Sequence, residues 1–108
     1  MLHITNSSWI VSFKRFNNSG VKNNRKINFP IENLNLERYV LGYDQDDSKY
    51  DLYAISNHIG GTRGGHYYAY VKNSDNNWYK YNDKYVSSLS EADLITPEAY
   101  CLFYKKKN

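Results

Sequence analysis

A histidine and an asparagine are the two residues of this sequence whose types and spacing best suit catalysis. His66 follows a glycine-rich stretch, residues 60–65, and begins an aromatic segment, whereas Asn82 ends the next aromatic segment. An imidazole that donates one ring N–H to an amide oxygen keeps a fixed tautomer and presents its other nitrogen as a general base. The pair suits a Cys-His-Asn hydrolytic site if the fold brings the two side chains together.

Two aromatic segments, residues 66–72 and 78–82, flank an asparagine-rich turn and predict a β-hairpin. With a three-residue turn at about residues 73–75, His66 lies opposite Asn82 and Tyr70 lies opposite Trp78. Directly opposite Cβ atoms are roughly 4.5–5.5 Å apart, which allows a His–Asn hydrogen bond. A hairpin histidine with an unrelated turn asparagine is the alternative, because a one-residue slip would put Asn82 on the other face.

The rest of the chain predicts a mainly β fold, an antiparallel sheet with one short helix. Residues 9–16, 50–57 and 99–104 are rich in β-branched and aromatic types, and the last strand precedes a solvated lysine tail, residues 105–107. A short helix is expected over residues 90–95 with Ser90 as its N-cap, and one helical turn over residues 33–39.

Length, charge and cysteine content exclude several classes of protein. The 108 residues suit one domain, and the single cysteine allows neither an intramolecular disulfide nor a Cys-x-x-Cys zinc module. A net charge of +3 does not by itself indicate nucleic acid. No export signal or apolar run of about 18 residues is present, so we expect a soluble intracellular protein of the cytoplasm or nucleus, without membrane contact.

The glycine stretch does not fit a phosphate-binding loop. Gly60 and Gly65 have the gap of a P-loop, but His66 and Tyr67 stand where Lys and Ser or Thr are required. Four glycines in six positions instead indicate either a hairpin corner or a loop against which another chain lies.

The residues around His66 resemble the histidine box of the ubiquitin-specific proteases, the ubiquitin carboxyl-terminal hydrolases of peptidase family C19. Residues 50–60 (YDLYAISNHIG), four more residues, then GHY at 65–67 fit the pattern Tyr-x-Leu-x-small-aliphatic-x-x-His-x-Gly-x-x-x-x-Gly-His-Tyr at every defined position. The likeness extends to residues 13–16 (FKRF), 28–30 (NFP), 78–83 (WYKYND) and 99–104 (AYCLFY). It therefore covers nearly the whole chain.

The resemblance implies the histidine-bearing half of a papain-like cysteine protease fold, which is α+β when complete. The activity it implies is thiol-dependent hydrolysis of isopeptide or peptide bonds after the C-terminal glycine of ubiquitin, without a cofactor. His66 would be the general base and acid, Asn82 would orient it, and the adjacent Asp83 is a second candidate for that role. Ubiquitin and ubiquitinated proteins would be the partners.

The resemblance also implies where the ubiquitin tail lies. Residues 58–65 and 17–26 would be the two loops that border it, with Gly64, Gly65 and Tyr67 near the cleft. His58 fits the family pattern as well, and we interpret it as a structural histidine at the base of its loop. The three histidines have no ligand spacing such as His-Glu-x-x-His, so no metal site is expected.

The family's cysteine box has no counterpart in residues 1–108, which would make this chain the C-terminal portion of a catalytic domain, inactive without its cysteine-bearing N-terminal half. Cys101 stands among Tyr100, Leu102 and Phe103, which indicates a structural thiol rather than a nucleophile. The sheet face meant for the other half would be uncovered, so we expect self-association or marginal stability.

Two other functions fit parts of the sequence. A non-catalytic ubiquitin-binding module would keep the fold without using the His66–Asn82 pair. A nucleic-acid-binding sheet is suggested by Tyr67, Tyr68 and Tyr70 beside several lysines, although these tyrosines are explained more simply as packing.

Overall fold

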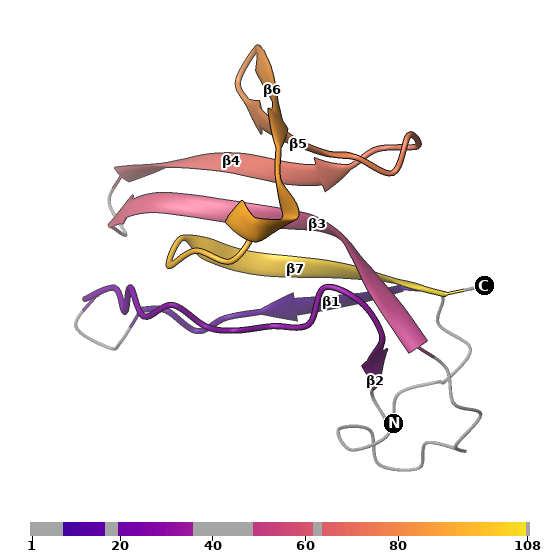
Figure 1. The fold of residues 1–108 in the computed structure, drawn as a ribbon. Coiled ribbons are helices and arrows are strands. Elements are labelled where there is room, and N and C mark those ends of the chain that lie inside the picture. The colour runs from indigo at the N-terminus through magenta and orange to yellow at the C-terminus, as the bar shows by residue number, and fades with distance from the viewer. Residues whose placement is uncertain (1–7, 17–19, 36–48, 62–63, 108) are drawn as a thin grey trace.

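Seven strands form one antiparallel sheet in the computed structural model, which describes residues 8–16, 20–35, 49–61 and 64–107 (Figure 1). The elements are β1 (Ser8–Ser12), β2 (Leu34–Asn35), β3 (Lys49–Gly61), β4 (Gly64–Lys72), β5 (Trp78–Asn82), β6 (Tyr85–Leu89), the 3-10 helix η1 (Glu91–Asp93) and β7 (Ala99–Lys106). The strand order is β1-β7-β3-β4-β5-β6, and β2 pairs with β3 beside this path. The predicted mainly β fold with one short helix is confirmed.

Strand β3 runs through the middle of the sheet and buries its apolar side chains on one face. Tyr50, Leu52 and Ile55 are fully or almost fully buried. A bulge in the pairing with β7, between Leu52 and Ala54, shifts the alternation so that Ile55 returns to the buried face. β3 therefore continues for 13 residues and reaches from the core to the glycine-rich tip.

The chain returns across the sheet through η1 before it forms β7. Ser90 caps this helix by accepting the Ala92 N–H at 3.3 Å, as the sequence predicted, and Leu94 just beyond is fully buried. β7 then pairs with β3 on one side and β1 on the other. The C-terminal strand is thus an inner strand of the sheet.

The core lies on one face of this sheet, beneath the segment 20–35 and η1, which pass in front of the strands in Figure 1. On the opposite face, the described residues leave Ile10 65% exposed and Tyr53 37% exposed. The molecule measures 42 × 39 × 20 Å, consistent with a sheet covered on one side. The core comprises Phe29, Tyr50, Leu52, Ile55, Tyr68, Tyr70, Trp78, Leu94, Ala99, Leu102 and Tyr104.

The predicted hairpin of β4 and β5 forms, but its register differs by two residues from our expectation. Tyr70 pairs with Lys80 and Lys72 with Trp78, so His66 does not lie directly opposite Asn82. The cause is a five-residue turn, residues 73–77, in which Asn76 takes a left-handed φ of 65°. A two-residue shift keeps each side chain on its face, so Asn82 still shares a face with His66.

Two other local expectations change. At the described start of the helical turn expected over residues 33–39, Asn33 has a φ of 59° and strand β2 follows, while residues 36–39 lie outside the described part. The lysine tail is also ordered, because β7 extends to Lys106. No helix among the described residues is long and apolar enough to cross a membrane.

Candidate active site

His66 and Asn82 are joined by a hydrogen bond, with 2.5 Å between Nε2 of the imidazole and Oδ1 of the amide. Both side chains are half-buried. An amide oxygen only accepts, so Nε2 carries the proton and Nδ1 is the nitrogen with a free lone pair. The contact is diagonal across β4 and β5, which is within reach of an imidazole and an asparagine.

Asp83 lies one residue beyond Asn82, in the two-residue turn that leads into β6. Its φ is 52° and its side chain is exposed. In the described part of the chain, the His66 imidazole donates its hydrogen bond to Asn82 rather than to Asp83.

The glycine stretch is the tip of a hairpin rather than a free loop. Gly60 pairs with Gly65 and Gly61 with Gly64, so only residues 62–63, which lie outside the described part, connect the two strands. The expectation of a loop over residues 58–65 is therefore wrong for most of its length. Gly64 and Gly65 stand directly before His66 in β4.

Gly65 is packed against the imidazole of His58. A Cβ atom at position 65 would lie 2.3 Å from Nε2 of His58 and 2.7 Å from the carbonyl oxygen of Ile59. Neither approach is possible for real atoms, so this position requires glycine. The backbone next to His66 is thereby held against the His58 ring.

His58 is buried and bonded to Lys22. Nζ of Lys22 lies 3.1 Å from Nδ1 of His58 and donates to the His58 carbonyl oxygen at 2.6 Å. Burial, and secondly the charge of Lys22, hold the pKa of His58 below its ordinary value. A neutral His58 accepts from the ammonium at Nδ1, which suits the structural role expected from the sequence.

Tyr67 projects from β4 on the side opposite to His66, because successive side chains of a strand alternate. Its ring is 59% exposed and lies 4.6 Å from the His58 ring, centroid to centroid. The structure thus separates the residues singled out in the sequence. His66 and Asn82 contact each other, whereas Tyr67 packs on the His58 ring on the other face.

Glu98 supports the residues around His58, and the sequence pattern did not single it out. Glu98 accepts from the Tyr68 hydroxyl, and its carbonyl accepts from the His58 N–H at 2.9 Å. Burial first, and then the bond to Glu98, raises the pKa of Tyr68. Lys22, His58, Tyr68 and Glu98 line one hollow of about 660 Å³, together with Asn24, Ile59, Gly60, Gly61, Tyr70, Thr96 and Pro97.

Cys101 lies far from the histidine. It pairs with Ser56 of β3, which in turn pairs with Ala69 of β4, so Cys101 is two strands across and three residues along from His66. Strand spacings make this roughly 14 Å. The sequence suggested that apolar side chains enclose Cys101. It is instead half-buried, with Sγ 3.4 Å from Oγ of Ser12.

No group of three or more His, Cys, Asp or Glu side chains in the described residues is arranged to hold a metal ion. A histidine held by an amide oxygen, on an antiparallel sheet, has the arrangement that a general base of a hydrolytic site requires.

Comparison with known proteins gives the family. A family model described as ubiquitin carboxyl-terminal hydrolase matches residues 7–104, and the chain belongs to this family. It is 42% identical over 101 residues to Ubiquitin carboxyl-terminal hydrolase 9 of Arabidopsis thaliana, covering 90% of this chain and 11% of that protein. It is 42% identical over 104 residues to Ubiquitin carboxyl-terminal hydrolase 12 of Saccharomyces cerevisiae, covering 92% of this chain and 8% of that protein.

Solved structures agree with this assignment. A chain of the Ubp8-Sgf11-Sgf73-Sus1 SAGA DUB module matches with a TM-score of 0.82 and 36% identity, covering 94% of this chain and 24% of that one. A chain of the same module bound to ubiquitin aldehyde matches with a TM-score of 0.81 and 33% identity, covering 94% of this chain and 25% of that one. The resemblance to the histidine-box part of the ubiquitin-specific proteases is confirmed. This chain spans about a tenth of the curated relatives and about a quarter of the solved chains.

Proposed function

We propose that this chain supplies the general base and its orienting amide to a cysteine deubiquitinase, which hydrolyses bonds after the C-terminal glycine of ubiquitin. The observation that carries the proposal is the hydrogen bond of 2.5 Å between His66 Nε2 and Asn82 Oδ1. It leaves Nδ1 as the base nitrogen in a chain whose family consists of ubiquitin carboxyl-terminal hydrolases. Ubiquitin and ubiquitinated proteins are the proposed partners, inside the cell.

In the proposed mechanism His66 takes up and releases one proton in each of two half-reactions. Nδ1 takes the proton of a cysteine thiol, and the thiolate attacks the carbonyl carbon of the ubiquitin tail. The imidazolium then protonates the departing lysine amine. Neutral Nδ1 finally takes a proton from the water that attacks the thioester and returns this proton to the departing cysteine sulfur. Asn82 keeps the ring orientation and the Nε2–H tautomer through these steps.

The nucleophile must come from a cysteine outside these 108 residues. Cys101 is the only cysteine of the sequence and lies roughly 14 Å from His66, too far for proton transfer. The chain alone is therefore proposed to be inactive, and a cysteine-bearing part of the catalytic domain is its required partner. His66 is half-buried, so its ring remains open to such a partner.

The backbone around Gly64 and Gly65 is proposed to border the ubiquitin tail. Both residues are exposed, and without side chains they allow a neighbouring chain to approach the strand closely. Tyr67 contributes an exposed ring on the other side of β4, beside His58. Asp83 is kept as the second candidate for orienting His66 once the partner is in place.

A chimeric catalytic domain tests the proposal. This chain would replace the corresponding segment of Ubiquitin carboxyl-terminal hydrolase 12 of Saccharomyces cerevisiae, which is 42% identical to it. We expect hydrolysis of a fluorogenic ubiquitin substrate by the chimera and none by the isolated chain. His66→Ala should abolish kcat, and Asn82→Ala should lower kcat by about 10- to 1,000-fold with little change in KM.

The controls separate catalysis from binding. Cys101→Ser should leave the activity of the chimera unchanged, since this thiol lies away from the base. Activity that survives His66→Ala would refute the assignment of the base. An inactive chimera, together with saturable NMR shifts when ubiquitin is added to the isolated chain, would favour the non-catalytic ubiquitin-binding module instead.

A further inference from the structure

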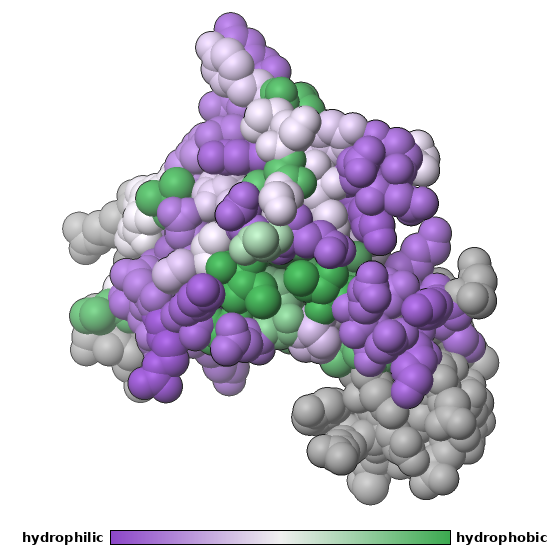
Figure 2. Space-filling model, viewed as in Figure 1, coloured by the Kyte–Doolittle hydropathy of each residue, from purple (hydrophilic) through white to green (hydrophobic). Residues whose placement is uncertain are grey.

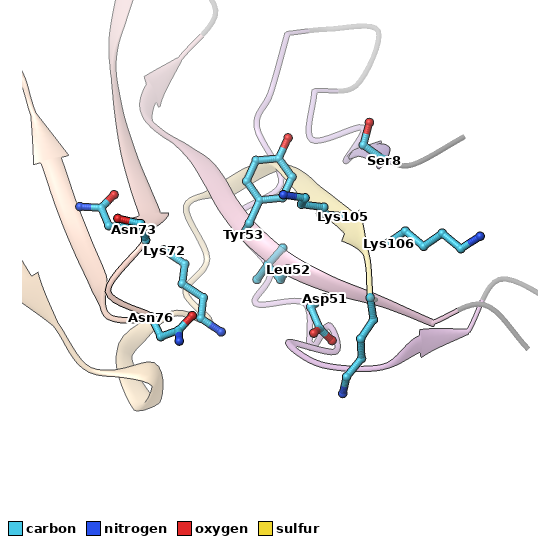
Figure 3. Close-up of a pocket in the computed structure, with 11 residues that line it drawn as sticks. Ser8, Asp51, Leu52, Tyr53, Lys72, Asn73, Asn76, Lys105 and Lys106 are labelled. Carbon is cyan, nitrogen blue, oxygen red and sulfur yellow. The ribbon is translucent and has the colours of Figure 1, made fainter. Parts of the chain in front are cut away.

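A basic hollow lies at the far end of the sheet from His66, where β3, β4 and β7 meet. It has a volume of about 720 Å³. Figure 3 shows Lys72, Asn73 and Asn76 on one side of the β3 residues, and Lys105 and Lys106 on the other. The lining residues are Ser8, Asp51, Leu52, Tyr53, Lys72, Asn73, Ser74, Asn76, Lys105, Lys106 and Lys107.

The backbone that carries Lys105, Lys106 and Lys107 is held in place by the sheet. Lys105 pairs with Asp51 and Lys106 with Tyr50 across β7 and β3. Lys107 donates its backbone N–H to the Lys49 carbonyl at 2.8 Å. The lysines that the sequence places in a solvated tail therefore have an ordered backbone, so an anion that binds them does not have to order the main chain.

Among the described residues, the positive charge of the hollow is largely uncompensated. Four lysines line it against one carboxylate, Asp51, of which Oδ1 accepts the Asn33 N–H at 3.0 Å. Within the described residues none of these lysines makes an ion pair with a carboxylate, and the one side-chain bond is from Lys107 Nζ to Asn33 Oδ1 at 3.1 Å. Hydrogen-bond donors from Asn76 and Ser74 stand beside the charges.

We propose that this hollow is a docking site for a short acidic peptide segment, whose carboxylates bind Lys72 and Lys105. Six residues of β4 separate Lys72 from His66, which is about 20 Å. The site is thus distinct from the proposed cleft for the ubiquitin tail. An acidic segment of a substrate or partner protein bound here would add affinity without touching the scissile bond.

The chemistry of the lining favours a peptide over nucleic acid. The lysines line one hollow from two sides, with Lys72 on one side and Lys105 and Lys106 on the other, instead of forming a stripe that follows a phosphate backbone. Tyr53 is the only aromatic lining residue, and its ring packs on Phe103 at 6.3 Å. Tyr68 and Tyr70 are buried at 7% and 6% exposure, so they offer no stacking platform.

Fluorescence anisotropy with a labelled hexaglutamate peptide tests this site on the 108-residue chain. We expect saturable binding that weakens with added salt. Lys72→Glu and Lys105→Glu should each weaken it by about threefold to tenfold. Lys26→Glu, an exposed lysine outside the hollow, makes the same change in net charge and should have much less effect.

A second measurement uses the unaltered chain, so it does not depend on whether the variants fold. In NMR spectra of the unaltered chain, hexaglutamate should shift residues 51–53, 72–76 and 105–107, and leave His66 unmoved. Equal weakening by Lys26→Glu, absence of binding, or shifts centred on His66 would overturn the proposal. Tighter binding of a hexathymidylate oligonucleotide would also overturn it, in favour of a nucleic-acid site.

Discussion

At the scale of single residues, two adjacent glycines carry different constraints. A side chain at Gly65 would meet the buried His58 ring, whereas a Cβ at Gly64 has no atom within 4 Å. We expect Gly65→Ala to destabilise the fold by about 1–3 kcal/mol through overpacking. Gly64→Ala should change stability by less than about 0.5 kcal/mol. Urea denaturation of both variants measures the difference, and equal losses would contradict the packing argument.

His58 predicts how stability depends on pH. Its pKa is lowered in the folded chain by burial and by Lys22, so the unfolded chain binds more protons just below its ordinary pKa of about 6.5. Stability contributed by neutral His58 is therefore complete above about pH 6.5 and is lost as the pH falls towards the lowered folded value. Thermal melts from pH 7.5 to pH 5 should show Tm falling with pH.

A variant isolates this effect. His58→Gln retains an acceptor for Lys22 but does not titrate, so its Tm should fall less over the same range. The NMR titration of the His58 ring should give a midpoint below that of a histidine in the unfolded chain. A midpoint at or above the ordinary value would refute the prediction.

The sequence predicted the candidate catalytic residues, but it did not predict the residues that hold the surrounding structure in place. The motif around His66 and the segment ending in Asn82 were enough to expect the pair, because the family pattern fixes both positions. Lys22 lies in an asparagine-rich segment with no periodicity, so nothing local predicts its bond to His58. Contacts between residues 36 apart depend on the whole sheet and have no local signature.

At the scale of elements, Arg15 joins the segment after β1 to the last strand. Its Nε donates to the Ala99 carbonyl at 2.6 Å, and Nη1 donates to the carbonyls of Asn23 and Arg25 at 3.0 and 2.8 Å. One guanidinium, 2% exposed, thus satisfies three carbonyl groups. The segment that carries Lys22 is held against β7 by this side chain.

Lysine cannot replace Arg15, because an ammonium does not present donors in a fixed planar fork. We expect Arg15→Lys to lower the free energy of unfolding by about 2 kcal/mol or more, since buried carbonyls lose their donors. Arg25→Lys, at an exposed position, is the matched control and should be nearly neutral. Guanidinium chloride denaturation gives the values, and hydrogen exchange of residues 20–25 should accelerate only in Arg15→Lys.

The β4–β5 hairpin shows what an element's sequence can determine. Its strands and its faces were predicted correctly, because aromatic alternation sets them. Its register was wrong by two residues, because the turn type depends on backbone angles: Asn76 adopts a left-handed φ and Asp75 accepts the Asn77 N–H at 3.0 Å. The hydrogen bond between His66 and Asn82 forms all the same, because a shift of two residues preserves the face.

At the scale of the whole molecule, the described residues cover the sheet incompletely. Its radius of gyration of 15.2 Å exceeds the value of about 13 Å for a compact chain of this length. On the covered side, an apolar groove of about 340 Å³ remains between β1, β7 and residues 27–34. Figure 2 shows apolar side chains gathered near the centre of one face and surrounded by hydrophilic ones. Composition alone could not locate these surfaces, since they depend on strand order.

The uncovered face predicts that the isolated chain associates with itself. Ile10, 65% exposed, pairs with Phe103, whose ring contacts Tyr53, so apolar atoms of three adjacent strands are in water. Burying such a strip against a second copy is favourable by roughly 25 cal/mol per Å² of apolar surface. Sedimentation velocity should therefore show dimers or larger species that increase with concentration.

Charge placed in that strip should reverse the association. Ile10→Lys puts an ammonium between the apolar side chains, and we expect it to shift the distribution towards monomer without lowering Tm, because Ile10 packs little in the folded chain. Val86→Lys, at a 55% exposed position of β6 away from the strip, makes the same kind of change and is the control that should leave the association unaltered. A wild-type chain that stays monomeric at high concentration and melts at high temperature would show that one covered face is sufficient for this sheet.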